Sequence, residues 1–304
     1  MAVAVEVLRG QPTPRPSEAP SVAPPIRPAG NGVWRALLNA LRHVLMIPVR
    51  SSATTGRGVA LAFSVVRYVV LDALTLRLPI GEVVTQGWTL LKVTMMPALL
   101  MAIPFGAIVS VQTSGLVNQV GASSLVGAAS GVGVIRQGAP ITAGLLMGGA
   151  AASAIASDLG ARAIREELDA LRVMGIDPAR HLVVPRFLAL ILIAPILCIF
   201  IIATAVAAAY TFAVSISDVS SGGFWMSFGA FASPVDVWFT IGKAILSAAI
   251  VAIISCLRGM EAKGGPRGVA DAVNSSVVLN VVCIAFTNLA ITQLQTMFFP
   301  MAVA

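Results

Sequence analysis

Few residues of this chain could carry out chemistry, and they do not form a catalytic set. Only 11% of its 304 residues are charged, and it contains two histidines and three cysteines. His43 and His181 lie among basic residues with no ligand set beside them, so each is expected to be a surface side chain. We therefore expect no catalytic residue, no metal site and no cofactor bound by this chain.

The cysteines point away from disulfide or zinc chemistry. Cys198, Cys256 and Cys283 all lie within apolar runs, and none belongs to a short Cys-x-x-Cys motif. Cysteines of this kind usually act as small buried hydrophobic residues.

Lys243 is the one ionisable residue that lies well inside an apolar run. It follows Gly242, but the upstream glycine and the following Ser or Thr of a phosphate-binding loop are missing. We expect its side chain to snorkel to the interface on the outer side of the membrane. Proton-driven transport usually needs carboxylates or histidines inside the membrane, and their absence here disfavours it, whereas sodium coupling through carbonyl and hydroxyl oxygens stays open.

Charged residues are concentrated at 158–178. Within this segment Leu168, Leu171 and Met174 recur at helical spacing, the acidic residues lie toward its start, and a glycine and a proline end it. We expect a short amphipathic helix at about 161–176, which is either a solvated loop helix or a lever that docks in a soluble motor subunit. The residues that would couple to such a subunit are Arg165, Glu166, Glu167, Asp169, Leu171, Met174, Gly175, Asp177 and Pro178.

The composition requires that these residues be positioned by membrane helices. The chain is 57% hydrophobic with a mean hydropathy of +0.91, whereas a soluble domain is about 45–50% apolar and about 25% charged. We expect an all-α integral membrane protein of the cytoplasmic (plasma or inner) membrane. Its net charge of +7 is then an orientation signal rather than a sign of a nucleic-acid partner.

Five apolar stretches are long enough to cross a bilayer, which takes about 20 residues. The segment 113–136 is rich in glycine and serine, and we expect it to be an outside or re-entrant connection. The five predicted spans are 93–112, 137–157, 187–215, 237–257 and 272–298.

Basic residues alternate between rich and poor segments along the chain. Of the 20 Lys and Arg residues, 10 precede residue 93, five lie in 137–186 and three in 244–271. Because cytoplasmic loops carry an excess of Lys and Arg, we place the N-terminus, 158–186 and 258–271 in the cytoplasm and the C-terminus outside.

Three regions follow from these patterns. Residues 1–32 contain seven prolines and are expected to form a disordered cytoplasmic tail. Residues 33–92 are expected to form interfacial or elbow helices, beginning with an amphipathic helix from Trp34 to Pro48. Residues 93–304 form the membrane domain.

Small residues mark one face of the second span. Such faces let helix backbones approach closely, which predicts a tightly packed helix at the centre of the bundle or at a subunit interface. The packing residues are Gly144, Gly148, Gly149 and Ser153.

The charged segment also resembles a known family. Arg165–Pro178, with Asp158-Leu-Gly before it and Leu182-Val-Val-Pro-Arg186 after it, closely resembles the MlaE/YrbE family of ABC-transporter permeases. The resemblance covers roughly 80–300. It extends to Phe105-Gly106, Gln112, Leu116, Gly121-Ala122, Arg136, Pro140, Gly259, Lys263-Gly264-Gly265, Gly268-Val269-Ala270, Ala272-Val273 and Val277-Val278.

Two charges typical of that family are missing. Gln137 stands where a glutamate is usual, and Gly148-Gly149-Ala150 stands where Ala-Gly-Arg is common. Three segments look more like the actinobacterial YrbE type, possibly its A-type subunit: Val219–Gly223, Arg258-Gly259 and Ala272–Asn274. Permeases of that type occur as paired, non-identical subunits in Mce systems.

The resemblance implies a permease subunit rather than an enzyme. Such a chain would pair with a second YrbE-like permease and bind a separate cytoplasmic ABC ATPase that holds ATP and Mg. Together with Mce-domain lipid-binding proteins it would move lipids or sterols across or out of the cytoplasmic membrane. The alternatives are an ion-coupled secondary carrier and a non-transporting membrane scaffold.

Overall fold

The computed structural model describes residues 56–71, 80–217 and 219–298, and these residues are helical and contain no strand. Within these described ranges, five helices are long and apolar enough to cross a membrane, which confirms the prediction of an all-α membrane protein with five spans. They are Ile80–Gln119, Val126–Ile164, Ala179–Ile216, Pro234–Met260 and Pro266–Phe298. The predicted tail at 1–32 and the predicted helix from Trp34 to Pro48 lie outside the described residues.

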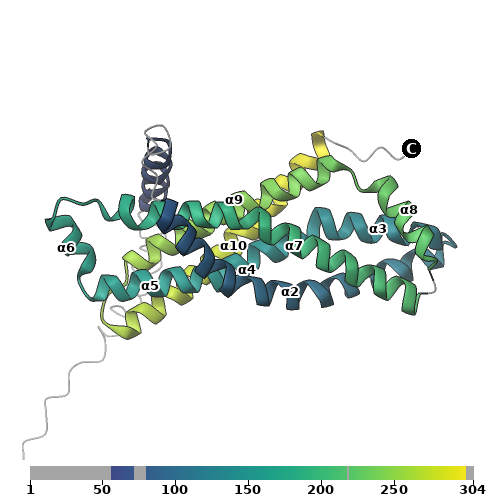
Figure 1. The fold of residues 1–304 in the computed structure, drawn as a ribbon, viewed down its shortest axis with the longest axis horizontal. Helices are drawn as coiled ribbons and strands as arrows, with labels where there is room; N and C mark the ends of the chain where they lie inside the picture. Colours follow the sequence, from purple (N-terminus) through teal and green to yellow (C-terminus); the bar gives the residue numbers. More distant parts are fainter. Residues whose placement is uncertain (1–55, 72–79, 218, 299–304) are drawn as a thin grey trace, which may run out of the picture. The chain divides into compact units, whose positions relative to one another are not determined.

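The spans follow one another with short connections (Figure 1). The second span combines three α-helices joined by π-helical turns at Val134–Gly138 and Met147–Ala151. The elements are α2 (Ile80–Gln119), α3 (Val126–Gly133), α4 (Ala139–Leu146), α5 (Ala152–Ile164), α6 (Glu167–Val173), α7 (Val184–Ile216), α8 (Ser221–Phe231), α9 (Pro234–Met260) and α10 (Pro266–Phe298), with a π-helical turn at Ala179–Val183 before α7.

The segment 113–136 is not the loop or re-entrant connection that its composition suggested. The helix α2 continues to Gln119, and the next span already begins at Val126. Glycine and serine lower helix propensity by at most about 1 kcal/mol per residue, and tertiary packing of this segment outweighs that cost. The expected border at residue 92 also falls inside α2, which runs unbroken from Ile80.

Hydrogen-bonding side chains mark where α8 and α9 begin. The hydroxyl of Ser220 accepts a hydrogen bond from the Gly223 amide at 3.2 Å, and that of Ser233 accepts one from the Asp236 amide at 3.3 Å. These are N-caps, and Pro234 at the first turn of α9 supplies the backbone angle that a helix start favours.

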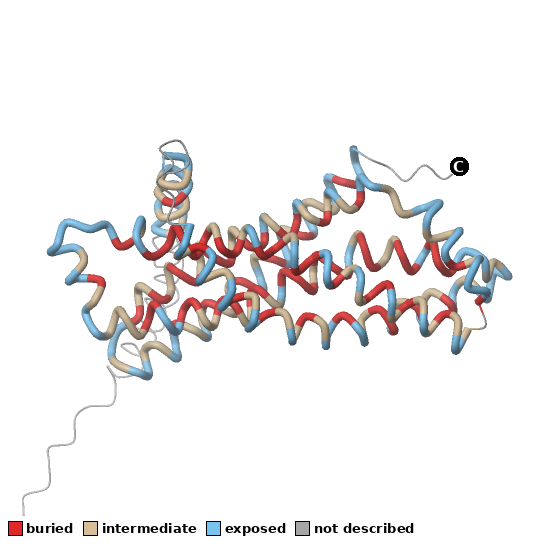
Figure 2. The backbone as a smooth tube through the Cα atoms, in the orientation of Figure 1, coloured by how far each residue is buried: buried red, intermediate tan, exposed pale blue. Residues whose placement is uncertain are grey.

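Buried residues line the inner faces of the spans along the bundle (Figure 2), and small residues among them allow the helices to pack at close range. The helices α2 and α7 run side by side. The hydroxyl of Ser110 on α2 donates a hydrogen bond to the backbone carbonyl oxygen of Ala209 on α7 at 2.9 Å. At Gly106 the two backbones are so close that a Cβ would collide with the carbonyl oxygen of Ala205. Only glycine fits this contact.

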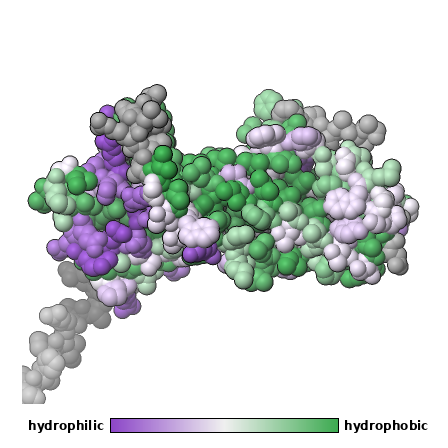
Figure 3. Space-filling model, viewed as in Figure 1, coloured by the Kyte–Doolittle hydropathy of each residue, from purple (hydrophilic) through white to green (hydrophobic). Residues whose placement is uncertain are grey.

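The two ends of the bundle differ in polarity. Hydrophilic side chains gather around α6, while apolar side chains cover the middle of the bundle (Figure 3). We call the end that carries α6 the charged end, and the end where α2 stops and α3 starts the far end. Assignment of the charged end to the cytoplasm remains a prediction from the distribution of basic residues.

Substitution of Gly106 by alanine should destabilise the bundle. The added methyl group would push α2 away from α7, and overpacking of this kind typically costs about 1–3 kcal/mol. Thermal unfolding in detergent should show a lower melting temperature for Gly106→Ala. The matched control is Gly115→Ala on the same helix, where a Cβ would meet nothing within 4 Å; equal melting temperatures for the two variants would contradict this packing.

Candidate functional site

The helix α6 forms a short bridge between two spans at the charged end. The chain leaves α5 at Ile164 and enters α6 at Glu167. Glu166 between them has a φ of +59°, a left-handed conformation that costs a non-glycine residue about 1–2 kcal/mol. The single helix expected at 161–176 is therefore wrong, because the chain turns sharply there to bring α6 across the ends of the spans.

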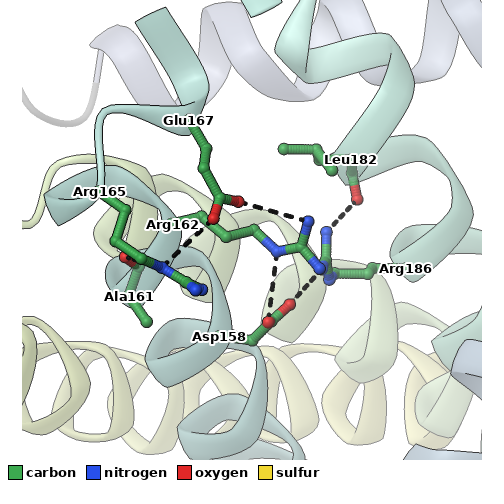
Figure 4. A network of polar contacts seen from close by, with 7 residues as sticks. All are labelled: Asp158, Ala161, Arg162, Arg165, Glu167, Leu182 and Arg186. Carbon is green, nitrogen blue, oxygen red and sulfur yellow. Dashed lines mark hydrogen bonds and ion pairs between the residues drawn. The ribbon is translucent and has the colours of Figure 1, made fainter. Parts of the chain in front are cut away.

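A network of ion pairs connects α6 to both spans (Figure 4). Asp158 on α5 accepts a hydrogen bond from Arg162 at 3.3 Å and pairs with Arg186 of α7. Arg162 in turn lies 3.8 Å from Glu167 of α6, and Arg165 lies 3.2 Å from the same carboxylate. Movement of α6 would therefore disturb both α5 and α7.

Arg186 is the buried member of this network. Its side chain is only 2% exposed, whereas the side chain of Asp158 is 44% exposed. It also donates a hydrogen bond to the carbonyl oxygen of Leu182 at 2.7 Å. A buried guanidinium needs such partners, because leaving its charge unpaired is strongly destabilising.

Apolar residues divide α6 into an anchored side and an exposed tip. Leu168 is buried in the main hydrophobic core, and Leu171 packs against that core half-buried. Beyond them, Val173 is 89% exposed, Met174 64% and Ile176 40%. An apolar tip of this kind, surrounded by charges, is typical of a protein contact surface.

The end of the segment is held by a turn and by the helix at 56–71, which carries Tyr68. Gly175 adopts a φ of +77°, which lets the Ile176 amide bond back to the carbonyl oxygen of Leu171 at 2.9 Å. Asp177 accepts a hydrogen bond from the hydroxyl of Tyr68 at 2.8 Å, and Pro178 is buried. This hydrogen bond, together with the negative charge of Asp177, raises the pKa of the Tyr68 phenol above its ordinary value.

A pocket of about 330 Å³ lies beside α6. Its lining mixes two carboxylates with basic and apolar side chains and joins α6 to the start of α2. The lining residues are Glu82, Arg162, Glu167, Ala170, Leu171, Met174, His181 and Leu182.

The predicted coupling residues occupy different environments. Arg165 and Glu167 belong to the network, whereas Asp169 pairs with exposed Arg172 at 2.7 Å, and Glu166 is exposed at the turn. The assignment of a coupling role to these residues remains a prediction. Residues that sequence reasoning left without a role carry the network: Asp158, Arg162 and Arg186. The spacing of Asp158 and Arg162, four residues apart, was the available signal.

Lys243 does not snorkel to an interface as expected. It is 1% exposed, and its ammonium group donates hydrogen bonds to the carbonyl oxygen of Arg136 at 3.1 Å and to the hydroxyl of Thr292 at 3.0 Å. Nearby, Arg136 pairs with Asp236 at 2.7 Å, and Gln295 donates to Asp236 at 2.9 Å. Three spans thus share one polar layer toward the far end, which satisfies the lysine internally.

The predicted packing residues of the second span face different neighbours. At Gly144 and Gly148 a Cβ would lie 2.7 and 2.8 Å from the side chain of Ile284 on α10. Gly149 has open space beside it, and Ser153 donates to the carbonyl oxygen of Ala150 at 2.9 Å. The first two therefore sit at a close helix contact, while a packing role for the other two remains a prediction.

Comparison with known proteins gives a consistent set of relatives. A family model described as Permease MlaE matches residues 83–294. A probable ABC transporter permease protein of Synechocystis sp. is 29% identical over 175 residues, which cover 58% of this chain and 66% of the relative. A probable ABC transporter permease protein of Rickettsia prowazekii is 31% identical over 159 residues, covering 52% of this chain and 61% of the relative.

A plant protein is also similar. The chloroplastic protein TRIGALACTOSYLDIACYLGLYCEROL 1 of Arabidopsis thaliana is 26% identical over 175 residues, covering 58% of this chain and 50% of that protein. Each of these matches thus spans less than two thirds of the relative's length.

Removal of the Asp158 carboxylate should destabilise the charged end more than removal of an exposed carboxylate. Asp158→Ala leaves buried Arg186 without its ionic partner, and we expect a loss of at most about 3 kcal/mol, the low end for a broken buried pair, because Asp158 is partly solvated. The control, Asp169→Ala, breaks an exposed pair whose carboxylate is 71% exposed and should cost about 0–1 kcal/mol. Melting temperatures in detergent compare the two, and an equal or reversed order would contradict the network's role.

Proposed function

Because this chain belongs to the MlaE permease family, we propose that it is the membrane subunit through which an ABC transporter moves a lipid or sterol, with ATP hydrolysed by a separate cytoplasmic subunit. The chain itself is a multi-pass membrane protein. The charged end would face the cytoplasm of the cell, as the excess of basic residues there suggests.

The exposed apolar tip of α6 carries this proposal. Val173 and Met174 extend from the charged end beside acidic and basic side chains. A lipid-facing role would not require the surrounding charges, and a water-facing role would not favour the apolar side chains. A cytoplasmic ATPase that covers the tip would satisfy both features.

The ion-pair network supports transmission from α6 to the spans. A partner that shifts α6 would pull on Glu167, and through Arg162 and Asp158 on both α5 and α7. Asp158 also pairs with buried Arg186, so the displacement would reach the packed part of α7. Because interiors are densely packed, such shifts move whole helices rather than single side chains.

An apolar cargo fits the character of the spans. No Asp, Glu, Lys or Arg occurs in 93–135, 137–157, 187–217 or 272–304. The spans 93–112, 137–157 and 272–298 would line the path. One relative is named after trigalactosyldiacylglycerol, a lipid, and this supports a lipid as the substrate class.

A second permease and Mce-domain proteins complete the proposed assembly. The helix α10 is the least buried of the spans, and Phe286 on it is 70% exposed. This face would contact the second permease or the lipid bilayer. The Mce proteins are proposed from the sequence resemblance to the YrbE type.

Charge introduced at the tip should separate the chain from its ATPase. We expect Val173→Asp with Met174→Asp to lose co-purified ATPase activity and lipid transport, because burial of two carboxylates against an apolar partner surface is costly. Both positions are exposed, so the fold should remain intact. The measurement is ATP hydrolysis of affinity-purified complexes, with transport of a fluorescent phospholipid in proteoliposomes.

Val120→Asp is the matched control, since Val120 is 81% exposed but lies at the far end. It should retain both activities. If the double tip variant keeps its ATPase while transport continues, the docking role of α6 is wrong. If transport proceeds in liposomes that contain no ATPase, the whole ABC assignment of this chain's activity fails.

A further inference from the structure

The helix α8 has an aromatic, exposed face at the far end of the bundle. Its sequence is SGGFWMSFGAF, and Trp225 is 48% exposed, Met226 79% and Phe231 48%. Residues 219–235 contain no charged side chain. A helix surrounded by water would not favour such an apolar face. The question is therefore what covers this face of α8.

The opposite face of α8 is fixed firmly to α3. A Cβ at Gly127 would collide with the backbone of Phe224, and one at Gly131 would collide with the ring of Phe228. Both helices advance by four residues between these two contacts, so α8 runs in the same direction as α3. Because α3 runs from the far end toward the middle of the bundle, α8 does as well (Figure 1).

Charged residues mark the depth at which α8 ends. On the second span, Arg136 and Asp158 are 22 residues apart, and on α9 Asp236 and Arg258 are also 22 residues apart. At 1.5 Å per residue this is about 33 Å, close to the thickness of the hydrocarbon core of a bilayer. The ion pair between Arg136 and Asp236 therefore lies near one boundary of that core.

The helix α8 lies directly outside this boundary. It ends at Phe231, only five residues before Asp236, and the Arg136–Asp236 pair lies about 15 Å along the helix from the start of α3 at Val126. The chain between α7 and α9 thus turns back toward this boundary as α8 passes α3. The zone directly outside the hydrocarbon core of a bilayer is the zone of the lipid headgroups.

The aromatic residues of this zone match those of a membrane interface. The ring of Trp225 lies 5.4 Å from that of Tyr210 on α7, and the Tyr210 hydroxyl lies 2.8 Å from the hydroxyl of Ser221. Trp238, two residues after Asp236, is 72% exposed. Tryptophan and tyrosine concentrate at the headgroup level of bilayers, where one part of the ring is apolar and another polar.

We propose that α8 is an interfacial helix, whose Trp225, Met226 and Phe231 face binds the lipid headgroup layer of the leaflet at the far end. Its continuity with the exposed apolar surface of the candidate span α9, which includes Trp238, favours lipid as the occupant over a protein. The helix descends toward the acyl chains, so Phe231 lies deeper than Trp225. This proposal does not depend on the identity of the cargo or of the ATPase.

The contact positions the start of α9. Only Ala232 and Ser233 separate α8 from Pro234, and Asp236 follows within the first turn. Lipid on one face and the glycines of α3 on the other hold α8 in place. The carboxylate of Asp236 is thereby kept against Arg136.

Tryptophan fluorescence in nanodiscs tests this placement. The full chain contains four tryptophans, and Trp34, Trp88 and Trp238 are replaced by phenylalanine so that Trp225 is the only reporter. In phosphatidylcholine nanodiscs, Trp225 should lose most of its fluorescence to lipids brominated high on the acyl chain and little to aqueous iodide. A second reporter, Phe231→Trp with Trp225→Phe, should be quenched more strongly by the same lipids because it lies deeper.

A chain that retains only Trp238 is the control, since that side chain lies exposed on a span and should be quenched by brominated lipid. Efficient quenching of Trp225 by iodide, with none by brominated lipid, would place α8 in water and overturn the proposal. Protection of Trp225 from both quenchers would show that protein covers the face, which also overturns it. An inverted depth order of the two reporters would contradict the descending course of α8.

Discussion

The bilayer offers no hydrogen-bond partners to a helix, so every polar group within it must be satisfied inside the protein. Among the described residues, three charged side chains are buried, and each one obeys this constraint: Arg186 pairs with Asp158, Asp236 pairs with Arg136, and Lys243 bonds to a carbonyl and a hydroxyl oxygen. The pairs form two layers about 33 Å apart along the helices. Between the two layers the spans pack mainly through small and apolar side chains.

This separation determines where a partner can act. A subunit outside the membrane reaches the spans at a layer of charge. At the charged end, the helix α6 is joined to such a layer and is exposed to a partner. Leu168 holds α6 to the core, Glu167 joins it to the ion pairs, and Val173 remains free for contact with a partner. At the other layer, α8 leads directly into Asp236. At each layer of charge, a short helix at the end of the bundle, α6 or α8, is thus linked to buried charged residues of the spans.

The sequence was sufficient to predict the number of spans, because hydropathy and the spacing of charges are determined by the bilayer itself. It misplaced 113–136, since the glycines that weaken a helix in isolation, Gly127 and Gly131, are the ones that make room for α8. It also missed the burial of Lys243, because its partners on Arg136 and Thr292 come from distant parts of the chain. The charged segment was found from its composition, but its turn at Glu166 depends on tertiary structure, and its coupling role remains a prediction.

We propose that a cytoplasmic ATPase binds this permease through α6. Hydrogen–deuterium exchange of the full chain in nanodiscs, with and without the ATPase that co-purifies with it, shows whether the ATPase covers α6. Binding should slow exchange of the amides in 165–177 and leave those of α8 unchanged. Unchanged exchange throughout 165–177 in the ATPase-bound complex, with slower exchange elsewhere, would contradict the account.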